Sequence, residues 1–203
     1  MLLLDADFLL AMRSFQYSGQ TNCPYSVLTL ITTFAKDNTN SSVTMASPNS
    51  HPGSLHLIAP NVSAFEPSKP LTSNQNTNTL VWIGGLGDSY SSVAYPYVLA
   101  QSLGPTWSLV IAALSSTGNS WGTSSIARDA DEIAKIVTYL KERRPNGKVV
   151  IMGHSTGCQD CMQYLTGTGA DKRPHVDGAV LQAPVSDREA LAADLPEDRK
   201  RHV

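Results

Sequence analysis

The sequence predicts an α/β fold with a mostly parallel sheet that carries helices on both faces. Short apolar runs recur along the chain, and segments whose apolar residues have helical spacing lie between them. Strands that are apolar on both faces are typical of a parallel sheet buried between two helical layers. The 203 residues, 41% of them hydrophobic, suffice for one domain with a substantial core.

Six segments are predicted as strands, the first two as an edge hairpin and the others as buried strands. They are Ser54–Ala59, Val62–Phe65, Thr79–Ile83, Trp107–Ala112, Lys148–Met152 and Val176–Gln182. Helices are predicted over Val93–Leu103, which Pro96 interrupts early, over Ser125–Arg144 and over Thr156–Leu165. The second is the clearest, because its apolar residues share one face and Pro145 ends it. These residues are Ile126, Ala130, Ile133, Val137 and Leu140.

Two parts of the chain depart from this rhythm. Residues 1–50 lack sustained periodicity, and residues 37–50 are rich in Asn, Ser and Thr, so we predict a poorly ordered or irregular extension there. A partial α/β domain then spans residues 51–203. After Val176–Gln182 the chain is polar and no further strand is predicted, so the sheet is expected to be incomplete on its C-terminal side.

Composition argues against several partners. A formal net charge of −2 and a pI of about 6.2 give no basic surface for nucleic acid or an anionic membrane, and neither is expected. No apolar run approaches the ~18 residues of a membrane span. The first residues carry Asp5 and Asp7 with no basic residue before Arg13, unlike a secretory signal. Three cysteines are too few for a disulfide scaffold.

The strongest chemical signal is the pentapeptide Gly153-His154-Ser155-Thr156-Gly157. It matches G-x-S-x-G between a predicted strand and a predicted helix, the context of the nucleophile elbow of α/β-hydrolases. Small residues are needed two positions before and two after the serine, because side chains there would collide across the turn. Ser155 would then project at the carboxyl edge of the sheet, beside the positive end of a helix. We therefore expect Ser155 to be a nucleophile.

A second signal follows the predicted strand Thr79–Ile83. An α/β-hydrolase places here a loop whose backbone N–H helps to form the oxyanion hole. We expect the N–H groups of Leu86 and Thr156 to form that hole, and glycines to let the backbone approach the substrate oxygen. The glycines of this loop are Gly84, Gly85 and Gly87.

Other interpretations of the two motifs are weaker. A dinucleotide loop would need a third glycine where Tyr90 stands, and no Gly-Lys-Ser/Thr of a P-loop is present. A tight turn without a catalytic role remains an alternative for the glycine-rich loop. Cys158 and Cys161 form a C-x-x-C without further ligands, which favours small packing residues under the elbow over zinc. We expect no metal and no cofactor.

The partners of a serine nucleophile are not evident. The chain order in this fold is Ser, then acid, then His, and only His175 and His202 follow Ser155. His175 precedes a strand and should lie at the opposite edge of the sheet, and His202 is the penultimate residue. Asp187 follows a predicted strand at the same edge of the sheet as Ser155. It is a candidate for the acid, for a residue that caps the loop, or for a substrate contact. His154 should point away from the serine.

Four segments together resemble a fungal family of α/β-hydrolases that includes the siderophore esterase acting on fusarinine-type siderophores. They are LVWIGGLGDS, STGNSWGTSSIARDADEI, VVIMGHSTGCQD and VLQAPVSDRE. The resemblance covers roughly residues 54–195. It implies an intracellular, cytoplasmic serine esterase, with Ser155 as nucleophile and Gly85–Leu86 as the oxyanion element. Family members continue into a cap and further strands that bring the acid and the histidine, so we expect this chain to be truncated.

The sequence thus predicts a serine ester hydrolase of the siderophore-esterase type. The expected partner is a small-molecule ester, with a hydroxamate siderophore suggested by the resemblance alone. The base is expected to be missing from the chain, and the acid as well unless Asp187 supplies it. The alternative is a catalytically inactive hydrolase-like binding protein or a gene-model fragment, because a serine without its base loses most of its rate advantage. Acyl transfer instead of hydrolysis also stays open, and the oligomeric state is not indicated.

Overall fold

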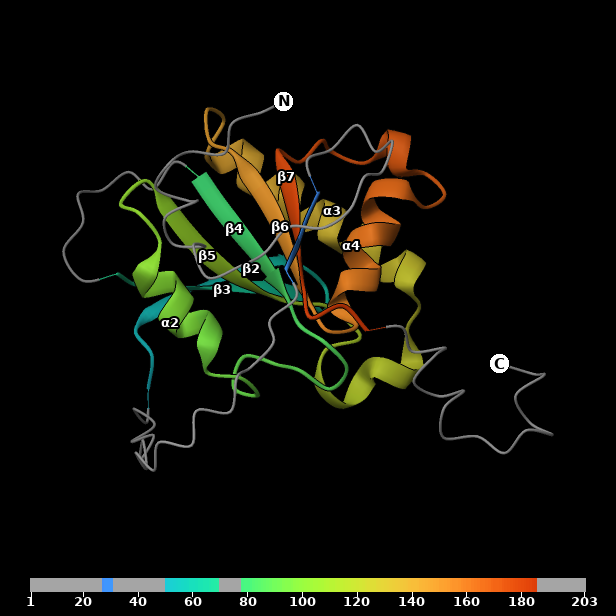
Figure 1. Ribbon diagram of the computed structural model, residues 1–203, viewed down its shortest axis with the longest axis horizontal. Helices are drawn as coiled ribbons and strands as arrows, with labels where there is room; N and C mark the ends of the chain where they lie inside the picture. The colour runs from blue at the N-terminus through green and yellow to red at the C-terminus, as the bar shows by residue number, and fades with distance from the viewer. Residues whose placement is uncertain (1–26, 31–49, 70–77, 186–203) are drawn as a thin grey trace.

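A seven-stranded sheet forms the centre of the molecule in the computed structural model, which describes residues 27–30, 50–69 and 78–185 (Figure 1). The strand order is β1-β7-β6-β4-β5-β3-β2. All pairs from β1 to β5 are parallel, and β3 and β2 are antiparallel at one edge. The strands are β1 Val27–Leu30, β2 Gly53–Ala59, β3 Val62–Pro67, β4 Asn78–Ile83, β5 Trp107–Ala113, β6 Val149–His154 and β7 Gly178–Gln182.

Helices cover both faces of this sheet. Helix α2 packs on one face, and helices α3 and α4 pack on the other (Figure 1). Their bounds are α2 Tyr95–Ser102, α3 Ile126–Arg143 and α4 Gly157–Thr166, with short 3₁₀ helices η1 Gly118–Thr123 and η2 Ala170–Lys172. The predicted α/β architecture with a mostly parallel sheet is confirmed. Among the helices of the described ranges, none has the length and apolar character that crossing a bilayer requires.

The core consists of two apolar layers, because the central strands bury both faces. In β4, Leu80 and Trp82 pack in the layer under α2, whereas Val81 and Ile83 pack in the layer under α3 and α4. All four side chains are fully or almost fully buried. Successive side chains of a strand point to opposite faces, so a continuous apolar run is what this position requires.

Two helices begin where local chemistry dictates. Pro96 does not interrupt α2 but lies in its first turn, where a missing N–H leaves no hydrogen bond unmade. In α3, the Ser125 side chain caps the helix by accepting a hydrogen bond from the Arg128 N–H (3.2 Å). The predicted apolar stripe of α3 is buried except at its first residue, Ile126, which is 40% exposed.

Strand β1 is an element that the sequence did not predict. It comes from within residues 1–50 and pairs in parallel with β7, Val27 with Ala179 through Leu30 with Gln182. A four-residue apolar run carries too little periodicity to be recognised, and its partner lies near the other end of the chain. The seventh strand therefore extends the sheet beyond β7, next to the strand that supports the elbow.

A polar network lies at the amino edge of the sheet, and we call it the amino-edge network. Arg144 donates to both carboxylate oxygens of Glu66 (2.7 Å) and to the hydroxyls of Thr79 (2.5 Å) and Ser108 (2.8 Å). His56 bonds the Glu66 carboxylate (3.1 Å). Burial alone would raise the pKa of Glu66, but the Arg144 charge and the hydrogen bonds outweigh it and lower this pKa.

Candidate active site

Ser155 stands at a tight reversal between β6 and α4. Strand β6 ends at His154 and α4 begins at Gly157, and Ser155 has φ of 53°. A left-handed conformation is strained for serine and is typical of a nucleophile elbow. The Ser155 carbonyl accepts from the Cys158 N–H (3.2 Å), which closes the turn, and the residue is only half-buried. The serine is therefore presented at the carboxyl edge of the sheet, as the motif predicts.

The two glycines of the motif are required by close backbone contacts. A methyl group built on Gly153 would lie 2.5 Å from the Gly157 carbonyl oxygen. One built on Gly157 would lie 2.4 Å from the Gly84 carbonyl oxygen. Neither distance is tolerable, and in both cases the obstacle is backbone that cannot move away. The steric reason that predicted small residues here is confirmed.

Strand β7 supports the elbow from behind. The Ser155 N–H donates to the Gln182 carbonyl (3.0 Å). The single proton of the Cys158 thiol can go to either of two carbonyls, that of Gly153 (3.2 Å) or that of Gln182 (3.5 Å). Burial raises the pKa of the Cys158 thiol to about 12 and also raises that of Cys161. Both cysteines are buried and reduced, so they pack under the elbow as neutral thiols.

The loop Gly84–Asp88, which we call the oxyanion loop, passes directly over Ser155. A methyl group on Gly85 would lie 2.9 Å from Ser155 Cβ, so only glycine allows this approach. Gly87 has φ of 78°, which a glycine adopts without strain. Within the described residues, neither the Leu86 N–H nor the Thr156 N–H donates to an internal acceptor. These are the two amides that the sequence predicts for an oxyanion hole.

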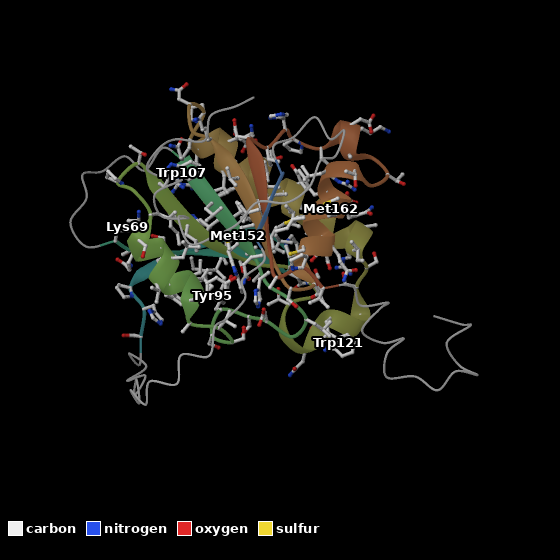
Figure 2. The ribbon with its side chains drawn as sticks, in the orientation of Figure 1. Lys69, Tyr95, Trp107, Trp121, Met152 and Met162 are labelled. Carbon is white, nitrogen blue, oxygen red and sulfur yellow. The ribbon has the colours of Figure 1, made fainter. Side chains whose placement is uncertain are left out.

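A cavity of about 150 Å³ opens beside these two amides. Its lining includes Leu86, Thr156 and Trp121 of the η1 turn. The Trp121 side chain is 55% exposed; in Figure 2 it lies at the opposite end of the molecule from Trp107, the first residue of β5. Asp129 lies at the cavity with a pKa raised by burial, and it accepts a hydrogen bond from Ser124 Oγ (2.8 Å). The cavity offers both apolar and hydrogen-bonding walls to a ligand.

The His154 ring is held in a cluster of aromatic and amide side chains. It stacks on Trp82 with ring centres 6.2 Å apart and meets the edge of Tyr95 at 5.5 Å. Its Nδ1 is hydrogen-bonded to Gln182 Oε1. Tyr95, labelled in Figure 2, accepts from Trp82 Nε1 (2.6 Å) and donates to the same Gln182 oxygen (3.3 Å). The ring therefore has a packing role, which suits the expectation that it points away from the serine.

None of the histidines in the described ranges can be assigned as the catalytic base for Ser155. His175 precedes β7 at the amino edge, opposite the elbow, because β6 and β7 are parallel. His51 stacks on Tyr97, and His56 belongs to the amino-edge network. Asp187 and His202 lie outside the described residues. The proposed acid Asp187 therefore stays a prediction.

Sequence reasoning missed three residues of the site. Gln182 reaches the elbow through both its backbone and its side chain, Asp88 bonds the oxyanion loop, and Tyr95 orients Gln182. Gln182 and Asp88 stand directly in the segments that carry the family resemblance, QAP and GLGD, which was the available signal. Tyr95 had none, since its contact joins the first turn of α2 to a strand far along the chain.

The sheet order, the elbow and the glycine-rich loop together define an α/β-hydrolase fold. The solved structure titled "Siderophore hydrolase EstB from Aspergillus fumigatus" matches with a TM-score of 0.59 and 35% sequence identity, covering 71% of this chain and 46% of that chain. An "Alpha/Beta hydrolase fold protein of unknown function" matches with a TM-score of 0.54 at 22% identity, over 76% and 52% of the two chains, and so supports the fold alone.

The family can also be stated. Residues 45–203 match the family described as "Protein of unknown function (DUF1749)", and the chain belongs to it. It is 38% identical over 178 residues to "Esterase AN6793" of Emericella nidulans, covering 74% of this chain and 47% of that protein. It is 39% identical over 168 residues to "Fusarinine C esterase sidJ" of Aspergillus fumigatus, covering 72% and 47%. The predicted resemblance to fungal siderophore esterases is confirmed. The chain spans about half the length of the curated relatives it matches.

Proposed function

We propose that this chain carries the nucleophile and the oxyanion hole of a serine ester hydrolase. The observation that carries the proposal is the position of Ser155, at φ of 53°, under a glycine-rich loop and beside two backbone N–H groups without internal acceptors among the described residues. Such amides stabilise the negative charge that develops on a carbonyl oxygen during acyl transfer. The N-terminus of α4 adds positive potential at the same point.

The reaction proceeds in two steps. Ser155 Oγ attacks the ester carbonyl carbon as its proton passes to a base, and the amides of Leu86 and Thr156 bind the oxyanion. The bond from the carbonyl carbon to the alkoxy oxygen then breaks, and the alcohol leaves with the proton. Water then attacks the acyl-enzyme in the same way, which releases the carboxylic acid product and restores the serine hydroxyl. For the carboxylate of the catalytic triad we propose Asp187.

The proposed substrate is a small-molecule ester of a hydroxamate siderophore. Two of the matched relatives are named for such substrates, a fusarinine C esterase and a siderophore hydrolase. The cavity next to Leu86 and Thr156 supports a small ester, since it combines indole walls with hydroxyl and carboxylate groups.

A fluorophosphonate probe tests the proposal on the purified chain. We expect covalent labelling of wild-type protein, abolished in Ser155→Ala and unchanged in Ser102→Ala, an exposed serine of α2 that bonds only its own helix. Hydrolysis of p-nitrophenyl acetate should follow the same order. A folded sample that reacts with neither reagent would contradict the proposal and favour the alternative, a hydrolase-like protein that binds a ligand without turning it over.

A further inference from the structure

The carboxylate of Asp88 lies inside the turn of the oxyanion loop. Asp88 Oδ2 accepts a hydrogen bond from the Gly85 N–H (2.8 Å), and the Asp88 N–H donates back to the Gly85 carbonyl (3.0 Å). Asp88 Oδ1 accepts from Ser92 Oγ (2.9 Å), and the Asp88 carbonyl accepts from the Gly118 N–H (2.9 Å). The side chain and the backbone of one residue thus close the loop on itself and tie it to Ser92 and to Gly118.

These hydrogen bonds set the orientation of the Leu86 N–H. Gly85 has almost no freedom toward Ser155, because a methyl group there would come within 2.9 Å of the serine Cβ. Leu86 follows Gly85 directly and its side chain is 56% exposed, so packing does little to hold it. Asp88 holds the two peptides that precede the Leu86 side chain: its carboxylate accepts from the N–H of the Gly84–Gly85 peptide, and its N–H donates to the carbonyl of the Gly85–Leu86 peptide. An oxyanion donor is effective only when its N–H is preorganised toward the developing charge.

A chain of contacts connects Asp88 with the elbow. His154 Nε2 lies 3.9 Å from Asp88 Oδ2, and His154 Nδ1 is hydrogen-bonded to Gln182 Oε1. The Gln182 carbonyl accepts from the Ser155 N–H (3.0 Å). Gln182 Oε1 is an amide oxygen that accepts from the Tyr95 hydroxyl, so His154 Nδ1 is the donor in its hydrogen bond to this oxygen. The oxyanion loop and the strand behind the serine thus approach each other through His154 and Gln182.

We propose that Asp88 is the positioning residue of the oxyanion hole, which holds the Leu86 amide over Ser155 through its hydrogen bond to Gly85. This inference rests on the proposed function for its catalytic consequence, and on geometry alone for its effect on the loop. The role depends on an acceptor oxygen and not on charge. An asparagine can supply that acceptor to Gly85, and its amide group can donate to Ser92 Oγ.

Two substitutions at Asp88 separate positioning from charge. In Asp88→Ala we expect the rate of fluorophosphonate labelling and the kcat for p-nitrophenyl acetate to fall about 100-fold, with KM changed by less than about 3-fold. In Asp88→Asn we expect both rates to stay within about 10-fold of wild type. The matched control is Asp131→Ala on α3, whose carboxylate is largely exposed and pairs with Arg173. It should behave as wild type.

Hydrogen exchange measures the loop itself and does not require activity. The Gly85 N–H should be protected in wild type and in Asp88→Asn and lose its protection in Asp88→Ala, while the amides of β6 stay protected in all three. Equal losses of rate in Asp88→Ala and Asp88→Asn would overturn the proposal, since charge would then be the requirement. Unchanged Gly85 exchange in Asp88→Ala would also overturn it. If wild-type protein does not react with the probe, the proposed function fails, and the exchange result still decides the positioning role.

Discussion

The two edges of the sheet are built in opposite ways. At the amino edge, Arg144 and Glu66 satisfy each other and draw in the neighbouring hydroxyls and His56. At the carboxyl edge, Ser155 and Ala183 have left-handed backbones, with φ of 53° and 48°. Two amides there find no acceptor among the described residues, and a cavity opens next to them. One edge pairs its polar groups with each other, whereas the other leaves two N–H groups without an acceptor among the described residues.

The largest expected effect comes from breaking the carboxyl edge at Gly157. In Gly157→Ala the new methyl group would meet the carbonyl oxygens of Gly84 (2.4 Å) and Ile83 (2.6 Å), so the elbow and the oxyanion loop must separate. We expect fluorophosphonate labelling of Ser155 to fall at least ~100-fold and the free energy of unfolding to fall by about 1–3 kcal/mol. Gly122→Ala is the control, because no atom lies within 4 Å of its added methyl group. Labelling of Gly157→Ala at the wild-type rate would contradict this account of the elbow.

The second prediction concerns a substitution that disrupts the amino-edge network and leaves the candidate active site intact. Arg144→Met leaves the Glu66 carboxylate without its charged partner, and losing one partner of a buried ion pair costs about 3–5 kcal/mol. We expect about 2 kcal/mol here, since the two side chains are 20% and 14% exposed and water screens them. Urea unfolding measures the loss.

The labelling rate for each folded molecule should stay within about 2-fold of wild type in Arg144→Met. Arg143→Met is the matched control, because the Arg143 guanidinium lies over the Tyr139 ring at 4.8 Å, a contact that contributes about 0.5–1 kcal/mol. A slower labelling rate in folded Arg144→Met would show that the two edges are not independent.

The smallest effect is a pH dependence of stability that arises from Glu66. Folding lowers the pKa of this carboxyl below its ordinary value of 4.5. The stabilisation is therefore complete above that value, and it is lost as the pH falls through the lower pKa of the folded state. Glu66→Gln should flatten this part of the profile of urea midpoints between about pH 6 and pH 3. Glu142→Gln, an exposed residue of α3, should not flatten it. Parallel profiles for wild type and Glu66→Gln would refute the assignment.

What the sequence could predict was set by local chemistry. The buried strands were recognisable because both of their faces must be apolar, and the elbow because its steric limits fall within five residues, from Gly153 to Gly157. The amino-edge network was not recognisable, since Arg144 and Glu66 meet only after α3 has packed on the sheet. The same holds for Asp88 and His154, which approach each other from separate strand ends. Long-range polar contacts carry no spacing that a single sequence reveals.

Strand β1 has a consequence for the order in which the sheet assembles. Its partner β7 lies near the far end of the described residues, so this pair joins two segments that are distant in sequence. Contacts between distant segments form slowly, because the chain entropy of closure is lost before any bond is made. The hairpin of β2 and β3 can form early, whereas the β1–β7 pair must wait until the chain has been made as far as Gln182. The edge of β7 that faces β1, opposite the edge that supports the Ser155 turn, is therefore protected from solvent only after β7 has been synthesised and β1 has paired with it.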